Sequence, residues 1–388
     1  MVQGYASVPR VSRALMVTAL LGGSLAALGS PVSAKETKPS VTVVARGLDN
    51  PRGLTFGPNG DLYIAEAGHG GAAPCIKDPE GGGKTCYGAS GAITRVSHGK
   101  QTRIAMGLPS LADPNSKGPS SATGVHDVAV TKDGKVFAVI GLGANPNDRG
   151  KLGAPGAGFG QLVQLDTDGN GGWHKIADLS AHEAKHNPAG GPVDSNPYSV
   201  LVVSDGLVVA DAGGNSLLKV TNDGKVSTLA VFANRQVTAP KALKMPAGAQ
   251  MPMEPVPTSI TRGPDGAFYV GQLTGFPFPP GAAHIFRVVP GKAPTTFAEG
   301  FTNIISVTFD QKGNLYVLEI VKDGLMYAEQ GGSMTGRLVK ITPDGLRTTV
   351  MTDGLIAPGG VTVGPDGALY VTNHSVFTGK GEVLRIAI

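Results

Sequence analysis

A short pattern of residues returns six times along this chain and limits what it can fold into more than any other feature. Each copy has alternating apolar residues, a turn with glycine and a second apolar segment, as in LTFGPNGDLYIAE at residues 54–66 and VTVGPDGALYVTN at 361–373. The six copies align on the turn glycines Gly60, Gly134, Gly206, Gly266, Gly313 and Gly367. β-Branched and aromatic residues on both sides of a Gly, Asp or Asn turn predict a β-hairpin. The chain is therefore expected to consist of repeated hairpins.

A second apolar hairpin follows most copies, so that each unit has four short strands. Segments such as AITRV at 92–96 and SLLKV at 216–220 supply a third strand, and KVSTLAVF at 225–232 is an example of a fourth. Four strands per unit, repeating at roughly 50 residues, are typical of propeller blades. The 58 glycines and 29 prolines fit many short strands joined by tight turns. We predict an all-β protein, a six-bladed β-propeller formed by residues 35–388 as one domain.

The sixth unit lacks an outer strand, because it ends after three strands at GEVLRI in residues 381–386. A suitable strand stands at the other end of the chain, as VTVVARGL in residues 41–48. It ends in Gly-Leu, as do the outer strands at 107–108 and 354–355. We predict that this N-terminal strand completes the last blade and closes the ring.

Residues 1–34 have the features of a signal peptide. Arg10 and Arg13 precede an apolar stretch at 14–28, and Val32-Ser33-Ala34 supplies small residues for cleavage. The stretch is too short and too rich in Gly and Ala for a spanning helix. We expect a protein secreted or held in the periplasm, with no membrane span after removal of the signal.

The charge of the mature chain argues against a nucleic-acid partner. Removal of Arg10 and Arg13 leaves 31 of the 33 Lys and Arg residues against 29 Asp and Glu, a net charge of +2. The basic residues do not cluster into the patch that binding of a phosphate backbone requires. We therefore expect no nucleic-acid binding.

The two cysteines, Cys75 and Cys86, lie in one glycine-rich loop. In an oxidising compartment we expect them to form a disulfide. The alternative is two free thiols. Two ligands are too few for a metal site made of cysteine alone.

Long loops are concentrated on one face of the predicted propeller. The connections between second and third strands at 67–91, 141–160, 273–282 and 320–335 are long, as are those between units at 109–123, 180–195 and 233–256. The hairpin turns on the opposite face are short. Because function concentrates in long loops, we expect the loop-rich face to bind a small molecule or a partner protein. We expect a monomer.

Two rings of side chains are expected around the axis on that face. The ends of the second strands supply Glu66, Ile140, Asp211, Gln272, Glu319 and Asn373. The starts of the innermost strands supply Arg52, His126, Tyr198, Thr258, Ile305 and Gly359. The candidate binding residues of the central channel are Arg52, Glu66, His126, Tyr198, Asp211, Gln272, Glu319 and Asn373.

Three carboxylates of these rings, Glu66, Asp211 and Glu319, are candidate metal ligands. Hard cations such as Ca²⁺ prefer oxygen ligands, so the cofactor would be Ca²⁺. Two alternatives stay open. The carboxylates could instead bind ordered water and pair with Arg52, or they could take part in catalysis.

The segment 182–186, HEAKH, matches the zinc-hydrolase motif H-E-x-x-H. On a helix, His182 and His186 would share one face and Glu183 would act as the base. Asn187-Pro188 is expected to end any such helix directly after His186. We favour a short polar helical turn over a zinc site.

The segment DTDGNG at 166–171 fits the first half of a calcium loop. However, the position of the expected bidentate glutamate holds Ala177, and the segment lies between strands rather than helices. A hairpin turn without metal is the simpler interpretation.

Several longer segments resemble the ScyD/ScyE family of exported bacterial propellers, named for members encoded with biosynthesis of the sunscreen scytonemin. They are GLDNPRGLTFGPNGDLYIAEAG (47–68), PCI with CYGASGAITRV (74–96), SNPYSVL (195–201), VADAGGNSLLKV (209–220), VGQLTGFPFPPGAAHIFRVVPG (270–291) and GFTNII (300–305). The resemblance implies an exported six-bladed propeller without an assigned reaction. It also implies a wider relation to NHL-type and lactonase-like propellers, and no catalytic set.

Two hypotheses for function follow. The first is a binding or scaffolding propeller outside the cytoplasm that holds a small organic ligand or a partner protein. The alternative is a metal-dependent hydrolase or lactonase that uses the central channel through Glu66, Asp211 and Glu319. We favour the binding protein over the enzyme, because a fold alone does not establish an activity.

Overall fold

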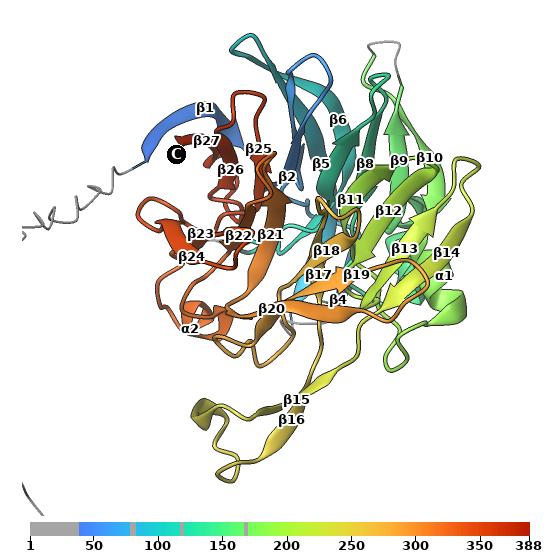
Figure 1. The fold of residues 1–388 in the computed structure, drawn as a ribbon. Coiled ribbons are helices and arrows are strands. Elements are labelled where there is room, and N and C mark those ends of the chain that lie inside the picture. Colours follow the sequence, from blue (N-terminus) through green and yellow to red (C-terminus); the bar gives the residue numbers. More distant parts are fainter. Residues whose placement is uncertain (1–38, 78–82, 117–119, 167–169) are drawn as a thin grey trace, which may run out of the picture. The chain divides into compact units, whose positions relative to one another are not determined.

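A computed structural model describes residues 39–77, 83–116, 120–166 and 170–388. The predicted signal peptide at 1–34 and residues 167–169 of the 166–171 segment lie outside these residues. Residues 39–388 form one compact unit. Figure 1 shows its sheets arranged around a common axis. The predicted six-bladed β-propeller is confirmed.

The first three blades follow one another along the chain. Blade 1 contains β2 (Pro51–Phe56), β3 (Leu62–Glu66), β5 (Lys84–Ser97) and β6 (Lys100–Ala112), and β4 (Cys75–Lys77) extends its sheet. Blade 2 contains β7 (Val125–Val130), β8 (Val136–Ile140), β9 (Gln161–Leu165) and β10 (Trp173–Asp178). Blade 3 contains β11 (Pro197–Val203), β12 (Gly206–Asp211), β13 (Ser216–Val220) and β14 (Val226–Val231).

The other three blades complete the ring. Blade 4 contains β17 (Pro257–Arg262), β18 (Phe268–Gln272), β19 (Ala283–Val288) and β20 (Thr295–Phe301). Blade 5 contains β21 (Ile304–Phe309), β22 (Leu315–Glu319), β23 (Arg337–Ile341) and β24 (Arg347–Met351). Blade 6 contains β25 (Gly360–Val363), β26 (Leu369–Asn373), β27 (Gly381–Ala387) and β1 (Ser40–Leu48).

The N-terminal strand β1 closes the ring, as the sequence predicts. It pairs antiparallel with β27, from Ser40 opposite Ala387 to Leu48 opposite Gly381, and Figure 1 shows the two side by side. Leu48 is fully buried. Blade 6 therefore consists of one strand from the start of the ring and three from its end.

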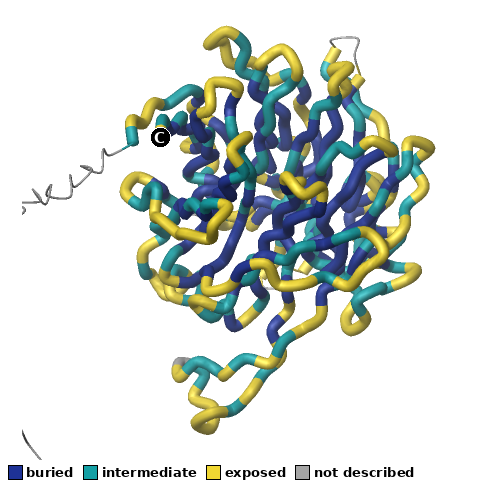
Figure 2. Tube along the Cα trace, viewed as in Figure 1, coloured by how far each residue is buried: buried dark blue, intermediate teal, exposed yellow. Residues whose placement is uncertain are grey.

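The hydrophobic core lies between adjacent blades rather than in one central layer. One cluster joins Phe137 and Leu162 of blade 2 to Val200, Val209 and Leu218 of blade 3. Figure 2 shows buried backbone along the strands and exposed backbone in the turns and loops. Each blade packs only on its neighbours, so a large domain needs no single large core.

Short helices and an extra hairpin occupy the long loops. The helical segments are η1 (Pro146–Leu152), η2 (Ala154–Gly158), α1 (Leu179–His186), η3 (Lys241–Leu243) and α2 (Leu325–Glu329). The hairpin of β15 (Arg235–Thr238) and β16 (Gln250–Met253) extends away from the ring in Figure 1. None of the helices in the described part of the chain has the length and hydrophobicity that a membrane crossing requires.

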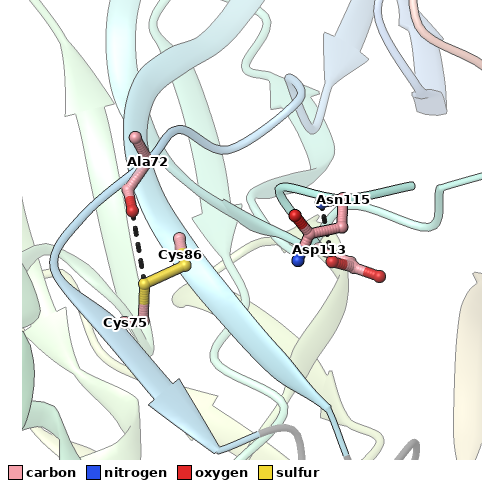
Figure 3. The surroundings of a disulfide bond; sticks show 5 residues. All are labelled: Ala72, Cys75, Cys86, Asp113 and Asn115. Carbon is pink, nitrogen blue, oxygen red and sulfur yellow. Dashed lines mark hydrogen bonds between the residues drawn. A yellow bond between two sulfur atoms is a disulfide. The ribbon is translucent and has the colours of Figure 1, made fainter. Parts of the chain in front are cut away.

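The predicted disulfide is confirmed. Cys75 on β4 faces Cys86 on β5 as a cross-strand pair with an S–S distance of 1.99 Å (Figure 3). The sequence predicts a plain loop here, but β5 and β6 continue their pairing past Gly91 to Cys86 and Ala112. This longer hairpin gives the loop of blade 1 a rigid base.

Candidate functional site

The six innermost strands enclose a cavity of about 300 Å³ along the propeller axis. It runs from the loop-rich end of these strands to their turn end. The members of the predicted inner ring that line it are His126, Tyr198, Thr258, Ile305 and Gly359. The sixth member, Arg52, directly precedes Gly53, which also lines the cavity.

Arg52 is a buried cation without a buried anion beside it. Its side chain is at β2 of blade 1, and the residue is 3% exposed. One guanidinium nitrogen, Nη2, donates to Ser121 Oγ at 3.0 Å and to the carbonyl of Ala122 at 2.8 Å. Nε is buried without a hydrogen-bond partner. Among the described residues, no carboxylate forms an ion pair with Arg52.

His126 and Tyr198 form an aromatic wall in the cavity. Their ring centroids lie 4.5 Å apart at a tilt of 36°. His126 Nδ1 lies 3.1 Å from the carbonyl oxygen of Pro197, and Nε2 accepts from Gly124 N–H. Burial, together with the nearby charge of Arg52, lowers the pKa of His126 to about 3. His126 is therefore neutral at physiological pH, which leaves Arg52 as the cation of this group.

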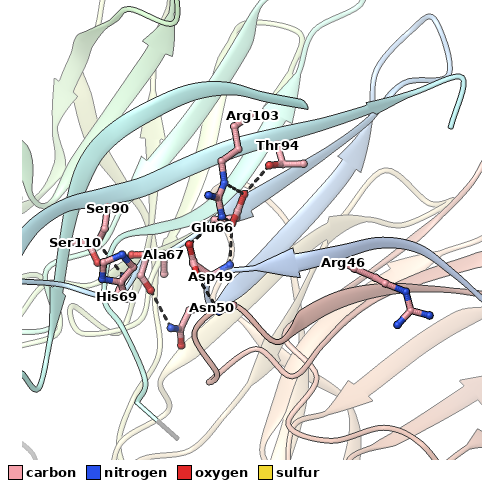
Figure 4. A network of polar contacts seen from close by, with 12 residues as sticks. Arg46, Asp49, Asn50, Glu66, Ala67, His69, Ser90, Thr94, Arg103 and Ser110 are labelled. Atoms are coloured by element: carbon pink, nitrogen blue, oxygen red, sulfur yellow. Dashed lines mark hydrogen bonds and ion pairs between the residues drawn. The ribbon is translucent and has the colours of Figure 1, made fainter. Parts of the chain in front are cut away.

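The second predicted ring lies inside the blades instead of at the axis. In blade 1, Glu66 is fully buried and accepts from Asp49 N–H at 2.8 Å and from Thr94 Oγ1 at 2.6 Å. Arg103 donates to both carboxylate oxygens, through Nε at 3.0 Å and Nη2 at 2.6 Å (Figure 4). These contacts raise the pKa of Arg103. Glu66 thus fixes the segment that enters its own blade.

The other blades repeat this arrangement with different partners. Glu319 accepts from Thr302 N–H at 2.8 Å and from two nitrogens of Arg337. Asp211 accepts from Asn196 N–H at 2.6 Å, and Asn373 from Ile356 N–H at 2.8 Å.

Gln272 of blade 4 differs, because its amide oxygen accepts from His284 N–H at 3.0 Å and from Arg235.

The structure does not bring Glu66, Asp211 and Glu319 together around the axis, because each accepts hydrogen bonds in its own blade. Among the residues that the structure describes, no three His, Cys, Asp or Glu side chains gather where they could hold a metal ion.

Sequence reasoning missed a ring of small polar side chains seven residues before each turn glycine. Asp127 accepts from Val200 N–H at 2.9 Å, and Ser199 accepts from Ile260 N–H at 3.3 Å. In the same way Ser259 binds Val307 N–H at 2.8 Å, and Ser306 binds Val361 N–H at 3.1 Å. Each contact ties an innermost strand to the next blade. The aligned series of small residues was the available signal.

At the remaining two positions of this series stand glycines, Gly53 and Gly360. A Cβ on Gly53 would lie 2.0 Å from Asp127 Oδ1, so no larger side chain fits there. Blades 6 and 1 are joined differently, by Thr372 Oγ1 donating to the carbonyl of Arg52 at 2.7 Å. The space beside Asp127 is thus reserved for its carboxylate.

Asp127 and His126 predict opposite effects of pH on stability. Burial raises the pKa of Asp127 from 3.8 to about 6, so the folded state holds an extra proton between pH ~4 and ~6. The free energy of unfolding contributed by Asp127 therefore falls as pH rises through that window, by up to about 3 kcal/mol. Channel water reduces this figure. For His126 the unfolded state binds the extra proton, so its contribution falls as pH drops from 6.5 toward 3.

Denaturant unfolding at pH 4.5, 6 and 7.5 measures both effects. Relative to wild type, Asp127→Asn is expected to gain stability as pH rises from 4.5 to 6. His126→Gln is expected to gain stability as pH falls over the same interval. Each variant controls for the other, since a general loss of packing would lower the free energy of unfolding by the same amount at every pH. Curves that run parallel to wild type would contradict the assignment.

The H-E-x-x-H segment forms helix α1, which ends at His186 as predicted, with Asn187 as its left-handed C-cap at φ 39°. The rings of His182 and His186 lie 4.6 Å apart, and His182 Nε2 is 2.9 Å from Thr228 Oγ1. Glu183 points the other way and is 1% exposed. Burial and the neighbouring Asp211 and Asp194 raise the pKa of Glu183 to about 7.

A second hollow of about 610 Å³ lies where the loops of blades 1 and 6 meet. Its lining includes His69, Asp113, Phe377 and Lys380. Its lining also includes Ser116 and Ser120, between which the chain is not described. The candidate site is therefore the axial cavity, with His126 and Tyr198 in its wall and Arg52 close to His126.

Comparison with known proteins identifies the fold and no family. No protein-family model matches the chain. No curated protein sequence matches it either. The ScyD/ScyE resemblance stays a prediction.

Solved propeller structures align with the chain. The PQQ-bound aldose sugar dehydrogenase of Streptomyces coelicolor is 13% identical, with a TM-score of 0.53 over 90% of this chain and 98% of that one. An oxidoreductase assigned as a glucose dehydrogenase, from Thermus thermophilus, is 18% identical, with a TM-score of 0.51 over 90% and 99%. Virginiamycin B lyase of Staphylococcus aureus is 14% identical, with a TM-score of 0.48 over 90% and 100%. At these identities the likeness concerns the fold alone.

Proposed function

We propose that this protein binds a small organic acid in its axial cavity, with Arg52 holding the acid group. The observation that supports the proposal is the buried guanidinium of Arg52, which has an unpartnered Nε and no carboxylate partner among the described residues. A buried charge is costly unless an opposite charge accompanies it. A ligand carboxylate would supply that charge and accept from the guanidinium.

The rest of the cavity suits the body of such a ligand. His126 is neutral and packs against Tyr198, so the two rings offer a flat wall beside the anion. Thr258 and Ile305 on other blades add a polar and an apolar contact. A volume of about 300 Å³ fits a small molecule. We therefore place aromatic or short aliphatic carboxylates first among the ligands.

Binding is favoured over metal-dependent hydrolysis for a geometric reason. The hydrolase hypothesis requires Glu66, Asp211 and Glu319 at the channel. Their oxygens accept hydrogen bonds inside separate blades. We further propose export of the protein, which the Cys75–Cys86 disulfide supports because such bonds persist in oxidising compartments.

Replacement of Arg52 by methionine is expected to abolish carboxylate binding. The measurement is the shift in Tm and the calorimetric affinity with benzoate and phenylacetate, each compared with its amide. Wild type should respond to the acids and not to the amides. Arg52→Met should weaken acid binding by at least roughly 30-fold, the loss associated with a buried charged hydrogen bond.

The matched control is Arg262→Met, on an exposed arginine at the turn end of blade 4. It should bind as wild type does. Arg52→Met without ligand should be at least as stable as wild type, because it removes an unpaired buried charge. Equal responses to acids and amides, or undiminished binding by Arg52→Met, would refute the proposal.

A further inference from the structure

The repeated blades allow one position, the end of the second strand, to be compared around the ring. In blade 1 the carboxylate of Glu66 lies against the guanidinium of Arg103, 2.6 Å from Nη2. In blade 5 Glu319 lies against Arg337, its direct cross-strand neighbour on β23. A cation thus accompanies each of these buried carboxylates.

Blade 3 lacks this cation. Asp211 is the fully buried carboxylate there, and its cross-strand neighbour on β13 is Ser216. Ser216 therefore occupies the position that Arg337 holds in blade 5. Its hydroxyl is buried without a hydrogen-bond partner. Within the described ranges, no lysine or arginine forms an ion pair with Asp211.

A second carboxylate stands where a cation would be expected. Glu183, on the inner face of α1, is 1% exposed, and both of its carboxylate oxygens are buried without a partner. Gly214 locates it relative to Asp211. A Cβ on Gly214 would lie 2.9 Å from Glu183 Oε2 and 3.2 Å from Asp211 Oδ2. The two carboxylates therefore flank the same point of the backbone.

We propose that blade 3 binds a divalent cation of the calcium type between Glu183 and Asp211, beside the hydroxyl of Ser216. The cation takes the place of the arginine of blades 1 and 5. Asp211 accepts from Asn196 N–H, Gly214 N–H and Ser195 Oγ, and Gly213 N–H lies close to the same carboxylate. Glu183, with both oxygens unpartnered, therefore supplies the larger share of the ligands.

The chemistry of the donors selects the ion. Carboxylate and hydroxyl oxygens without nitrogen or sulfur favour a hard cation, and Ca²⁺ accepts irregular sets of oxygens that water and backbone carbonyls complete. The proposed ligands are two carboxylates with neutral oxygens, and Asp194, which lies near Glu183 and adds negative charge, is not one of them. None of Glu183, Asp211 and Ser216 lines the axial cavity. The ion would join α1, which leads out of blade 2, to the sheet of blade 3.

The test uses the full-length protein freed of metal with a chelator. Titration with CaCl₂ is expected to show one ion per chain by calorimetry. It should raise Tm by about 4 °C at a calcium concentration of ~100 times Kd. Mg²⁺ should give a smaller shift, because it requires a more regular octahedral geometry.

Glu183→Gln should lose the calcium response while melting at or above the chelated wild type, since it removes an unpaired buried charge. Glu329→Gln changes an exposed residue of α2 and should respond as wild type does. Ser216→Arg would place in blade 3 a guanidinium equivalent to that of Arg337 in blade 5. It should melt above chelated wild type and no longer respond to calcium.

Absence of calcium binding by wild type, or an undiminished response of Glu183→Gln, overturns the proposal. If Ser216→Arg does not fold, the comparison of Glu183→Gln with Glu329→Gln decides alone.

Discussion

A chain that begins at Asp49 lacks β1. We expect it to be no longer stably folded at room temperature and to show no cooperative unfolding transition. Without β1, the edge of β27 is left unpaired along its whole length. The fully buried side chain of Leu48 is also lost, which alone costs about 2–5 kcal/mol. The exposed cluster of Leu54, Leu62 and Val383 adds to this loss. The total exceeds roughly 5 kcal/mol, comparable to the whole stability of many domains.

Thermal and urea unfolding, followed by circular dichroism, measure this effect. A chain that begins at Lys35 keeps β1 and serves as the reference with an intact blade 6. Leu48→Ala provides a graded step, with an expected loss of about 2–4 kcal/mol. A chain starting at Asp49 that still unfolds in one sharp transition near the Tm of the Lys35 chain would show that blade 6 is stable with three strands.

Glu319→Ala is expected to destabilise the fold by about 3 kcal/mol. The substitution removes the acceptor of Thr302 N–H and leaves the guanidinium of Arg337 without its partner. Loss of one member of a buried pair costs 3–5 kcal/mol, and the 32% exposure of the Arg337 side chain reduces that cost. Glu319→Gln keeps an acceptor for Thr302 and should lose about half as much.

A double-mutant cycle with Arg337→Met separates the ion pair from the backbone contact. The coupling energy is expected to be about 1–3 kcal/mol, measured by urea unfolding at neutral pH. Asp133→Ala serves as the control, because its pair with Lys135 is exposed on both sides, and it should leave stability close to that of wild type. Additive losses from Glu319→Gln and Arg337→Met would contradict the role assigned to the pair.

The fold was predictable because each copy of the repeat contains the residues that determine its hairpin. Each copy carries its own turn glycine at a positive φ, such as Gly60 at 79° and Gly367 at 76°, between two apolar strands. Closure was predictable because the sixth unit has only three strands, and the N-terminal segment 41–48 is an unassigned strand that ends in Gly-Leu, as other outer strands do. The hairpin β15–β16 was not, because its strands, RQVT and QMPM, contain few of the β-branched and aromatic residues that indicate a strand.

The candidate site was only partly predictable. Polarity at a strand end indicates that a side chain is needed, but not which face of the blade it occupies. Glu66 and Glu319 have arginine partners in their own blades. A single sequence does not show that Arg337 faces Glu319 from the neighbouring strand while Arg103 reaches Glu66 from one strand further out. His126 and Tyr198 line the axial cavity because they stand at the starts of innermost strands, whereas Arg52 does not line it, and the role of all three in binding stays a prediction.

The motif around Glu183 shows how a motif can draw attention to the right residue for the wrong chemistry. The zinc interpretation depends on the histidines, which lie on the outer side of α1 near Thr228. The burial of Glu183 depends on contacts with Gly214 and Asp211, which belong to the next blade. The segment around Glu183 does not itself show that this side chain is buried against the next blade.

The position of β1 also determines when the ring can form during synthesis. Strand β1 is synthesised before the other strands of the propeller, but its partner β27 is synthesised last. The carbonyl of Arg52 likewise accepts a hydrogen bond from Thr372, which follows 320 residues later. Until then an apolar strand has two open edges, a form prone to aggregation. An incomplete chain is therefore distinguishable from a finished one at its N-terminus. A chaperone that shields β1 would therefore have to stay bound until β27 has been synthesised.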